Sequence, residues 1–229
     1  FEQQPLGGLL ADAGHLDQPR RLLRCHGLGQ IGHAHARENG QRRARAHIVA
    51  REAAVLCGVP WAEAALRALD PQVQLTWHVH EGQTCRPDQV VLEMQGQARA
   101  LLSAERTALN FMQLLSAVAT KTATYVAAVQ GTRARIVDTR KTLPGLRLAQ
   151  KYAVTVGGGV NHRIGLHDAV LIKDNHIAAA GGVSAVLKAA QAVATQASFI
   201  EIEVETLEQL REALDAGATM VLLDNMPLT

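Results

Sequence analysis

The chain has 229 residues, of which 48% are hydrophobic and 19% are charged, as in soluble globular proteins with a substantial core. Its formal net charge is only +2, so the chain as a whole is not predicted to bind nucleic acid or a membrane surface. No apolar run reaches the roughly 18 residues of a membrane span. Cys25, Cys57 and Cys85 form no Cys-x-x-Cys pair, which argues against disulfides and zinc and favours the reducing cytoplasm.

The first part of the chain predicts an α+β region. Residues 1–45 show little periodicity and predict no element. Strands are expected at residues 47–50 and near Val55, followed by a helix from Pro60 to about Leu69. The alternation in VQLTWHVHEG and the apolar run in DQVVLEMQG predict two strands of an antiparallel pair.

A long helix is predicted next, in LLSAERTALNFMQLLSAVATKTATYVAAVQG. Ser103 is the candidate N-cap and Gly131 the candidate stop, which puts a domain boundary near Ser103. Arg106 would then fall in the first turn, where the helix dipole disfavours a cation. A bound anion would compensate for that charge.

After Gly131 the pattern changes to alternating strands and helices. Strands are predicted at residues 134–137, 169–172, 199–204 and 219–223, and helices at about 146–156, 183–194 and 207–216. This order implies a parallel sheet with crossover helices, either doubly wound or closed into an α/β barrel. A full barrel has eight strands, so we expect either an open sheet or a barrel completed by further residues. Residues 1–229 expressed alone are expected to be poorly soluble and inactive.

Charged residues follow three of the predicted strands directly, in VDTRK, IKDNH and LLDN. Barrel active sites form at this edge, where strands end and loops begin. The basic candidates gathered there, with Arg106 as a sixth, are Arg140, Lys141, His162, Arg163 and Lys173. Because such cations repel one another, their convergence predicts a ligand with several negative charges.

Acidic residues occupy the same region. The alternation in IEIEVE puts Glu201, Glu203 and Glu205 on one face of a strand, which is unusual unless that face lines a polar site. With Asp224, these carboxylates could bind magnesium or the hydroxyls of a sugar. The combination predicts a site for a phosphorylated, metal-bound sugar and a second, acidic substrate.

Three other features have competing interpretations. Residues 157–159 (GGG) either end a helix or let backbone amides approach an anion. His78 and His80 share a strand face, but two ligands without a third favour an exposed face over a metal site. The arginines of RENGQRRARAHIVARE are diluted by Glu38 and Glu52, which favours a solvated surface over a nucleic-acid patch.

Several longer segments resemble one enzyme family. ERTALNFMQLLS, DTRKTLPGLR, KYAVTVGGGVNHRIGLHDAVLIKDNHI, IEIEVETLEQL and VLLDN are similar to quinolinate phosphoribosyltransferases, the carboxylating nicotinate-nucleotide pyrophosphorylases of NAD biosynthesis. The resemblance extends over about residues 46–225. It implies that quinolinate and phosphoribosyl pyrophosphate are converted to nicotinate mononucleotide, pyrophosphate and carbon dioxide.

The resemblance also implies roles for the candidate residues. Arg106 would reach the site of a neighbouring subunit, and Lys141 would meet phosphoribosyl pyrophosphate. Glu203 and Asp224 would serve the ribose hydroxyls and magnesium, which would be bound with that substrate rather than by the protein alone. The two carboxylates of quinolinate would be bound by Arg140, His162, Arg163 and Lys173.

The fold implied is α/β, with an N-terminal α+β sandwich domain at residues 1–102 and an incomplete, open α/β barrel at residues 103–229. A cytoplasmic homodimer or higher homo-oligomer is expected, without nucleic-acid or membrane partners. The family's acidic Asp-x-Thr segment is not visible in residues 1–45, and the glycine-rich loops that bind the sugar 5′-phosphate would follow Thr229. Two alternatives stay open: a paralogous transferase of the molybdenum-transport-associated type, and an inactive anion-binding fragment.

Overall fold

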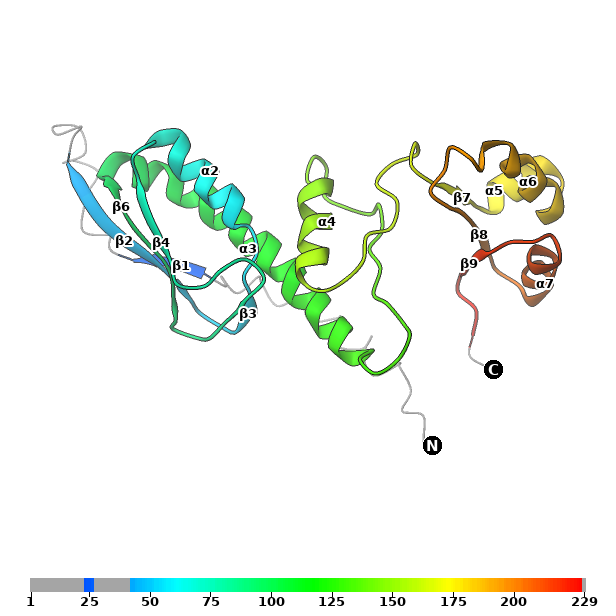
Figure 1. The fold of residues 1–229 in the computed structure, drawn as a ribbon, viewed down its shortest axis with the longest axis horizontal. Helices are drawn as coiled ribbons and strands as arrows, with labels where there is room; N and C mark the ends of the chain where they lie inside the picture. Colours follow the sequence, from blue (N-terminus) through cyan, green and yellow to red (C-terminus); the bar gives the residue numbers. More distant parts are fainter. Residues whose placement is uncertain (1–22, 27–41, 228–229) are drawn as a thin grey trace. The chain divides into compact units, whose positions relative to one another are not determined.

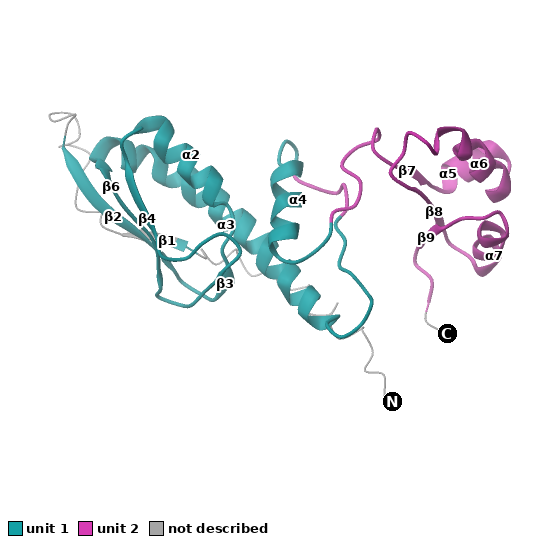
Figure 2. Cartoon of the chain, viewed as in Figure 1, with its two compact units in different colours: residues 1–138, 144–160 teal, residues 139–143, 161–229 magenta. Residues whose placement is uncertain are grey.

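The computed structural model describes residues 23–26 and 42–227 (Figure 1). The chain forms two compact units, shown in different colours in Figure 2. The first unit comprises the described residues up to Asp138 together with Pro144–Val160, and the second comprises Thr139–Leu143 and the residues from Asn161 onward. Most of the segment for which no element was predicted lies outside the described residues.

The first unit is built on a four-stranded antiparallel sheet. Its strands, in the order in which they pair, are β1 (Leu23–His26), β2 (Arg43–Ala50), β6 (Val90–Gln97) and β4 (Gln74–Trp77). The predicted antiparallel pair is confirmed, because Trp77 of β4 lies opposite Leu92 of β6. The strand predicted at residues 47–50 is the second half of β2. Two residues of β3 (Ala54–Val55) pair with β5 (Thr84–Cys85) in a separate ladder.

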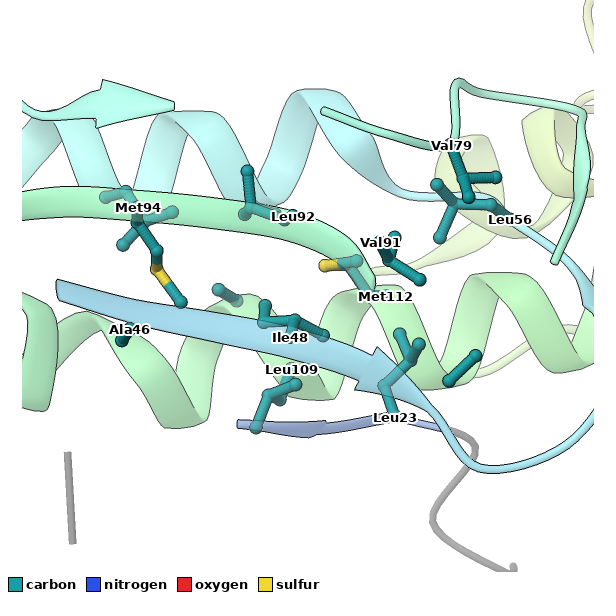
Figure 3. Close-up of a cluster of buried hydrophobic side chains, with 14 of the residues drawn as sticks. Leu23, Ala46, Ile48, Leu56, Val79, Val91, Leu92, Met94, Leu109 and Met112 are labelled. Atoms are coloured by element: carbon teal, nitrogen blue, oxygen red, sulfur yellow. The ribbon is translucent and has the colours of Figure 1, made fainter. Parts of the chain in front are cut away.

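Two helices, α2 (Val59–Leu69) and α3 (Ala98–Ala128), cover one face of this sheet, as Figure 1 shows. Alternate strand residues such as Ile48, Leu92 and Met94 point into the layer between sheet and helices, where they meet Leu109 and Met112 of α3 (Figure 3). This two-layer arrangement buries one continuous core. The predicted α+β sandwich is confirmed.

The start of α3 differs from the prediction. The helix begins at Ala98, and Ser103 is an exposed residue inside it, so the predicted N-cap is wrong. The reason is a remote cap: the buried carboxylate of Asp70 accepts a hydrogen bond from the Gln97 N–H at 2.8 Å. Arg106 therefore lies in the third turn, where the dipole argument does not apply. The boundary predicted between residues 102 and 103 falls within this helix and stays a prediction.

Helix α4 (Arg147–Val156) packs on the second half of α3 through a small apolar cluster that includes Leu115, Ala119 and Ala153. Gly157 is its C-cap, which confirms the interpretation of the triple glycine as a helix end. A Cβ atom at Gly157 would lie 2.4 Å from the Ala119 carbonyl oxygen. This glycine is therefore required where α4 ends against α3.

The strand predicted at residues 134–137 is not formed. Only an isolated parallel bridge joins Val137 to Val160, in which the Val160 N–H donates to Ile136 O at 2.8 Å and the Asp138 N–H donates to Val160 O at 3.1 Å. A strand needs several consecutive residue pairs joined by hydrogen bonds, whereas these two bonds join only one pair. The segment leads directly to Arg140.

The second unit contains a parallel sheet with the order β7 (Val170–Ile172), β8 (Ile200–Val204) and β9 (Met220–Leu223). Its helices are α5 (Asp174–Ala180), α6 (Val183–Ala190) and α7 (Leu207–Asp215), with a 3₁₀ turn at Gln191–Val193. Helix α6 is shorter than predicted, and α5 was not predicted. The alternation of parallel strands and helices confirms the α/β class of this region.

One face of the parallel sheet packs on the helices. Ile172, Ile202 and Val204 are buried there against α6 and α7 residues such as Leu187 and Ala213. The opposite face of the same strands carries the charged residues considered below. Among the residues that the structure describes, no helix combines the length and the apolar composition needed to cross a membrane.

Candidate active site

Strand β8 supplies the acidic side of the site. Since side chains alternate along a strand, Ile202 and Val204 enter the apolar core while Glu201 and Glu203 lie on the other face. Glu201 is buried, and Glu203 is partly buried. Glu205 follows the last residue of β8 and is exposed, so it does not share their environment. The predicted polar face therefore contains two of the three glutamates.

Lys173 faces Glu203 at the carboxyl end of the sheet. The parallel register pairs Ile172 with Ile202, so the next residue of each strand comes to the same edge. Lys173 Nζ donates a hydrogen bond to Glu203 Oε2 at 2.6 Å. The lysine side chain is 44% exposed and that of Glu203 only 15%, so this ion pair lies at the boundary with solvent.

His162 is bound to the same face of β8. Its Nε2 atom lies 2.8 Å from Glu201 Oε2, and its ring packs against Phe199 with ring centroids 4.8 Å apart at an angle of 54°. Phe199 and Glu201 are two residues apart, so both project from one side of the extended chain. Glu201 therefore contacts an edge of the imidazole ring, and Phe199 packs against the ring.

Arg140 and Arg163 are two cations of the second unit whose charges act on each other. The pKa of the Arg163 guanidinium is lowered, first by burial and then by the positive charge of Arg140, while Asp168 and Glu201 oppose this shift. Arg163 Nη1 donates to the Ala169 carbonyl oxygen at 3.4 Å. The buried Nε of Arg140 has no hydrogen-bond partner within residues 23–26 and 42–227. A buried guanidinium N–H in that state can be satisfied by an anionic ligand.

The loop that carries His162 and Arg163 is closed by Asp168. Its carboxylate accepts hydrogen bonds from the N–H groups of Ile164 at 2.7 Å and Gly165 at 2.8 Å. These two bonds lower the pKa of Asp168. The side chain of Asp168 thus bonds to the backbone of its own loop just before β7 begins.

The remaining predicted residues lie in different surroundings. Lys141 is exposed, and its backbone N–H donates to Thr139 Oγ1 at 3.1 Å. Asp224 follows β9 directly and is half-buried, and its N–H donates to Val204 O at 3.0 Å, which puts it beside the end of β8. Arg106 is exposed on α3 and belongs to the first unit. The structure thus joins His162 to Glu201 and Lys173 to Glu203 by direct contacts.

Metal ligands are sparse in the described part of the chain, where no group of three His, Cys, Asp or Glu side chains could bind a metal ion. His78 and His80 are both exposed, and His78 Nε2 lies 3.3 Å from Glu93 Oε1. The interpretation of these histidines as an exposed surface is confirmed.

Comparison with known proteins identifies the family. Two family models match the chain, the N-terminal domain of quinolinate phosphoribosyl transferase at residues 33–116 and its C-terminal domain at residues 118–229. A solved structure of the nicotinate-nucleotide pyrophosphorylase from Francisella tularensis is 41% identical, with a TM-score of 0.80, and the match covers 86% of this chain and 70% of that one. The chain belongs to the quinolinate phosphoribosyltransferase family.

Curated members of the quinolinate phosphoribosyltransferase family match over most of the chain. The probable carboxylating nicotinate-nucleotide pyrophosphorylase of Bacillus subtilis is 44% identical over 188 residues, which are 82% of this chain and 65% of the relative. The corresponding enzyme of Mycobacterium leprae is 48% identical over 186 residues, or 79% of this chain and 64% of the relative. The chain therefore spans slightly less than two thirds of the length of these relatives.

Two charged contacts of this quinolinate phosphoribosyltransferase family member were not predicted. One is the bond from His162 to Glu201, since only Glu203 was given a role. The other joins Lys151 Nζ to Asp138 Oδ1 at 2.5 Å in the first unit. No sequence signal indicated the second, because Lys151 is two residues from both Ala149 and Ala153 and so lies off the face of α4 that these alanines share.

Proposed function

We propose that the protein is a quinolinate phosphoribosyltransferase. It would join the ring nitrogen of quinolinate to the anomeric carbon of phosphoribosyl pyrophosphate and release pyrophosphate. Loss of the 2-carboxylate as carbon dioxide would then give nicotinate mononucleotide. The names of relatives at 44% and 48% identity, both carboxylating nicotinate-nucleotide pyrophosphorylases, support this reaction.

The observation that carries the proposal is the state of Arg140 and Arg163. Arg140 has a buried N–H without a partner among the described residues, and its charge disfavours the charged form of Arg163. Two guanidinium groups in this relation are stabilised by an anion with more than one negative charge. Quinolinate has two neighbouring carboxylates, each of which suits the forked donors of an arginine. His162 and Lys173 would complete the set of donors to quinolinate.

The second substrate would bind along the ends of β8 and β9. Lys141 would contact the pyrophosphate group, and Glu203 and Asp224 would contact the ribose hydroxyls. Positive charge develops on the sugar as the bond to pyrophosphate breaks, and these two carboxylates would stabilise it. Most of the rate enhancement would come from such charge stabilisation and from holding the two substrates in line.

Magnesium would bind together with phosphoribosyl pyrophosphate. Carboxylate oxygens suit this cation, and Glu203 and Asp224 supply two groups of that kind beside the same strand ends. Since the described residues include no three-ligand cluster, the substrate's own oxygens would provide the other ligands. The ion would neutralise charge on the departing pyrophosphate.

We further propose a cytoplasmic homodimer in which Arg106 of one subunit contributes to the site of the other. The exposure of Arg106 on α3 supports this role, because its guanidinium is available to a ligand or a partner. A helix is also a rigid support for such a residue. The dimer would then be required for quinolinate binding.

The proposal is tested by assaying the full-length protein with quinolinate, phosphoribosyl pyrophosphate and magnesium. Pyrophosphate release and carbon dioxide from quinolinate labelled at the 2-carboxylate should appear in equal amounts. Arg140→Ala and Arg163→Ala should each weaken quinolinate binding by about 2–5 kcal/mol in calorimetric titration, since each removes a donor from a desolvated carboxylate. Arg133→Ala, at an exposed arginine, is the control. Unchanged affinity in both site variants would exclude these arginines from the quinolinate site.

A further inference from the structure

The loop of residues 161–169 carries Arg163 and contains no helix or strand. Two backbone bonds to one side chain fold it back toward β7. The Ile164 N–H donates to Asp168 Oδ2 at 2.7 Å, and the Gly165 N–H donates to Asp168 Oδ1 at 2.8 Å. These N–H groups belong to the two residues that directly follow Arg163. The carboxylate therefore limits the backbone on the carboxyl side of this arginine.

Asp168 is itself bonded to the segment that leads into β8. Its carbonyl oxygen accepts a hydrogen bond from the Ser198 N–H at 2.8 Å. Next to it, the Val170 N–H donates to the Phe199 carbonyl oxygen at 3.1 Å, which begins the pairing of β7 with β8. The side chain of Asp168 thus starts from backbone that belongs to the edge of the sheet. A group supported in this way can hold an irregular loop in one position.

The side chain of Arg163 is also related to this segment. Its Nη1 atom donates to the carbonyl oxygen of Ala169, the residue after Asp168, at 3.4 Å. The pKa of Arg163 is lowered by burial and by Arg140, and Asp168 is the first of the two carboxylates that oppose this shift. Asp168 therefore acts both on the backbone beside Arg163 and on the charge of its guanidinium.

We propose that Asp168 is a positioning residue for quinolinate binding, which acts by holding the loop so that the Arg163 guanidinium faces a substrate carboxylate. The inference rests on the proposed function, because it concerns the support of a residue proposed to bind quinolinate. Asp168 itself would not touch the substrate. Its role would be exerted through Arg163.

Two effects of Asp168 on an anionic ligand have opposite signs. Its negative charge would repel quinolinate, whereas its hydrogen bonds would keep Arg163 in place. Asp168 is only partly buried, so water and salt weaken the repulsion. The geometric effect is not screened, because a forked guanidinium that moves by about 1 Å loses its alignment with a carboxylate. We therefore expect the positioning effect to be the larger one.

The binding test uses Asp168→Ala and Asp168→Asn in the full-length protein. Asp168→Ala should raise the Kd for quinolinate by about 10-fold, since a misplacement of about 1 Å can cost up to about 100-fold. Asp168→Asn should raise it by only about threefold, because the amide oxygen can still accept one of the two bonds. The Kd for phosphoribosyl pyrophosphate with magnesium should stay unchanged in both variants. Asp215→Ala, at an exposed aspartate of α7, is the matched control.

A double-mutant cycle tests whether Asp168 acts through Arg163. Asp168→Ala is combined with Arg163→Ala, and the quinolinate Kd values of the four proteins are compared. We expect Asp168→Ala to change the Kd by less than about twofold once the guanidinium is absent. A merely structural role would weaken binding by the same factor in both backgrounds, so equal factors would overturn the inference.

Amide hydrogen exchange observes the two bonds in the free protein. The Ile164 and Gly165 N–H groups should exchange at least about 10-fold faster in Asp168→Ala, because each loses the carboxylate as an acceptor. The Val170 N–H should exchange at its original rate, which would show that β7 still pairs with β8. Unchanged exchange at Ile164 and Gly165 would mean that other contacts hold the loop, and the inference would be wrong.

The outcomes distinguish the two proposals. If the original protein binds quinolinate and Asp168→Ala binds it equally well or more tightly, the positioning role is wrong and the proposed function stands. If the original protein binds no quinolinate, the proposed function fails and the positioning role fails with it. If Asp168→Ala does not fold, the same comparisons with Asp168→Asn decide. A variant with a lower melting temperature but an unchanged Kd for quinolinate would also overturn the inference.

Discussion

Lys151 Nζ and Asp138 Oδ1 lie 2.5 Å apart, and their side chains are only 3% and 7% exposed. Breaking such a pair removes an opposite charge from beside a buried one, so Asp138→Asn or Lys151→Met should destabilise the protein by about 3–5 kcal/mol. Denaturant unfolding of the full-length protein measures the effect. The double variant should lose much less than the sum of the single variants, because both single variants break the same ion pair.

The exposed ion pair between Arg67 and Glu63 in the same unit is the control. Its side chains are one turn apart on α2 and are 49% and 33% exposed, so Arg67→Ala should cost less than about 1 kcal/mol. Equal losses at Arg67 and Lys151 would show that burial does not set the strength of the inner pair.

The contact between Lys173 and Glu203 joins residues with different proposed substrates. Lys173→Met should weaken quinolinate binding by roughly 2 kcal/mol or more, since it removes a cation from a carboxylate. Glu203→Gln should instead lower kcat and weaken binding of phosphoribosyl pyrophosphate with magnesium, because it would remove the negative charge that is proposed to face the sugar. Separate titrations with each substrate decide the point. An identical pattern in both variants would mean that the pair acts as one structural unit.

The proposed exchange of Arg106 between subunits predicts complementation. Arg106→Ala and Lys141→Ala should each be inactive as homodimers, whereas hybrids of the two should regain about a quarter to a half of the original activity per hybrid dimer. One of the two sites in such a hybrid would contain both original residues. Purification through two different affinity tags, followed by the pyrophosphate assay, measures this. Inactive hybrids would place Arg106 in the site of its own subunit or outside any site.

The stability of the loop bearing His162 and Arg163 should decrease at acid pH, because its Asp168 carboxylate becomes protonated. Its folded pKa is lowered by the N–H groups of Ile164 and Gly165, so the stabilisation is complete above the unfolded pKa of about 3.9. It is lost as the pH falls through the lower, folded value, because the unfolded chain then binds the proton more readily. Melting temperatures between pH 6 and pH 2 should therefore fall less for Asp168→Asn than for the original protein. Asp215→Asn, at an exposed residue of α7, is the control.

The elements that sequence patterns predicted well are those with a strong internal period. The alternation around Glu201 and Glu203 identified β8 and its polar face, and the apolar repeat identified most of α3. Element boundaries were less accurate because their determinants are remote in the chain. The N–H of Gln97 is capped by Asp70, and those of Gly58 and Val59 at the start of α2 are bound by Glu81. Local propensity contains no information on such partners.

The candidate site was likewise predictable only where local sequence patterns determine it. Positions just after parallel strands could be predicted as a site, because such strand ends meet at one edge of a sheet. The pairing of His162 with Glu201 spans 39 residues of sequence and depends on how a loop folds over β8. Helix α5 was missed for a related reason. Its first turn, Asp174 to His176, is so polar that it resembles a loop, and only Ile177 is buried.

The continuity of helix α3 limits how the two domains could be exchanged between relatives. The N-terminal family domain ends at residue 116 and the C-terminal one begins at residue 118, so the junction lies inside a continuous helix. Met112, before the junction, packs in the sandwich core, whereas Ala119, after it, packs against α4. Since each residue turns a helix by about 100°, adding or deleting one residue there would rotate one set of contacts away from its core. Chimaeras joined within α3 must therefore conserve its length as strictly as its apolar residues.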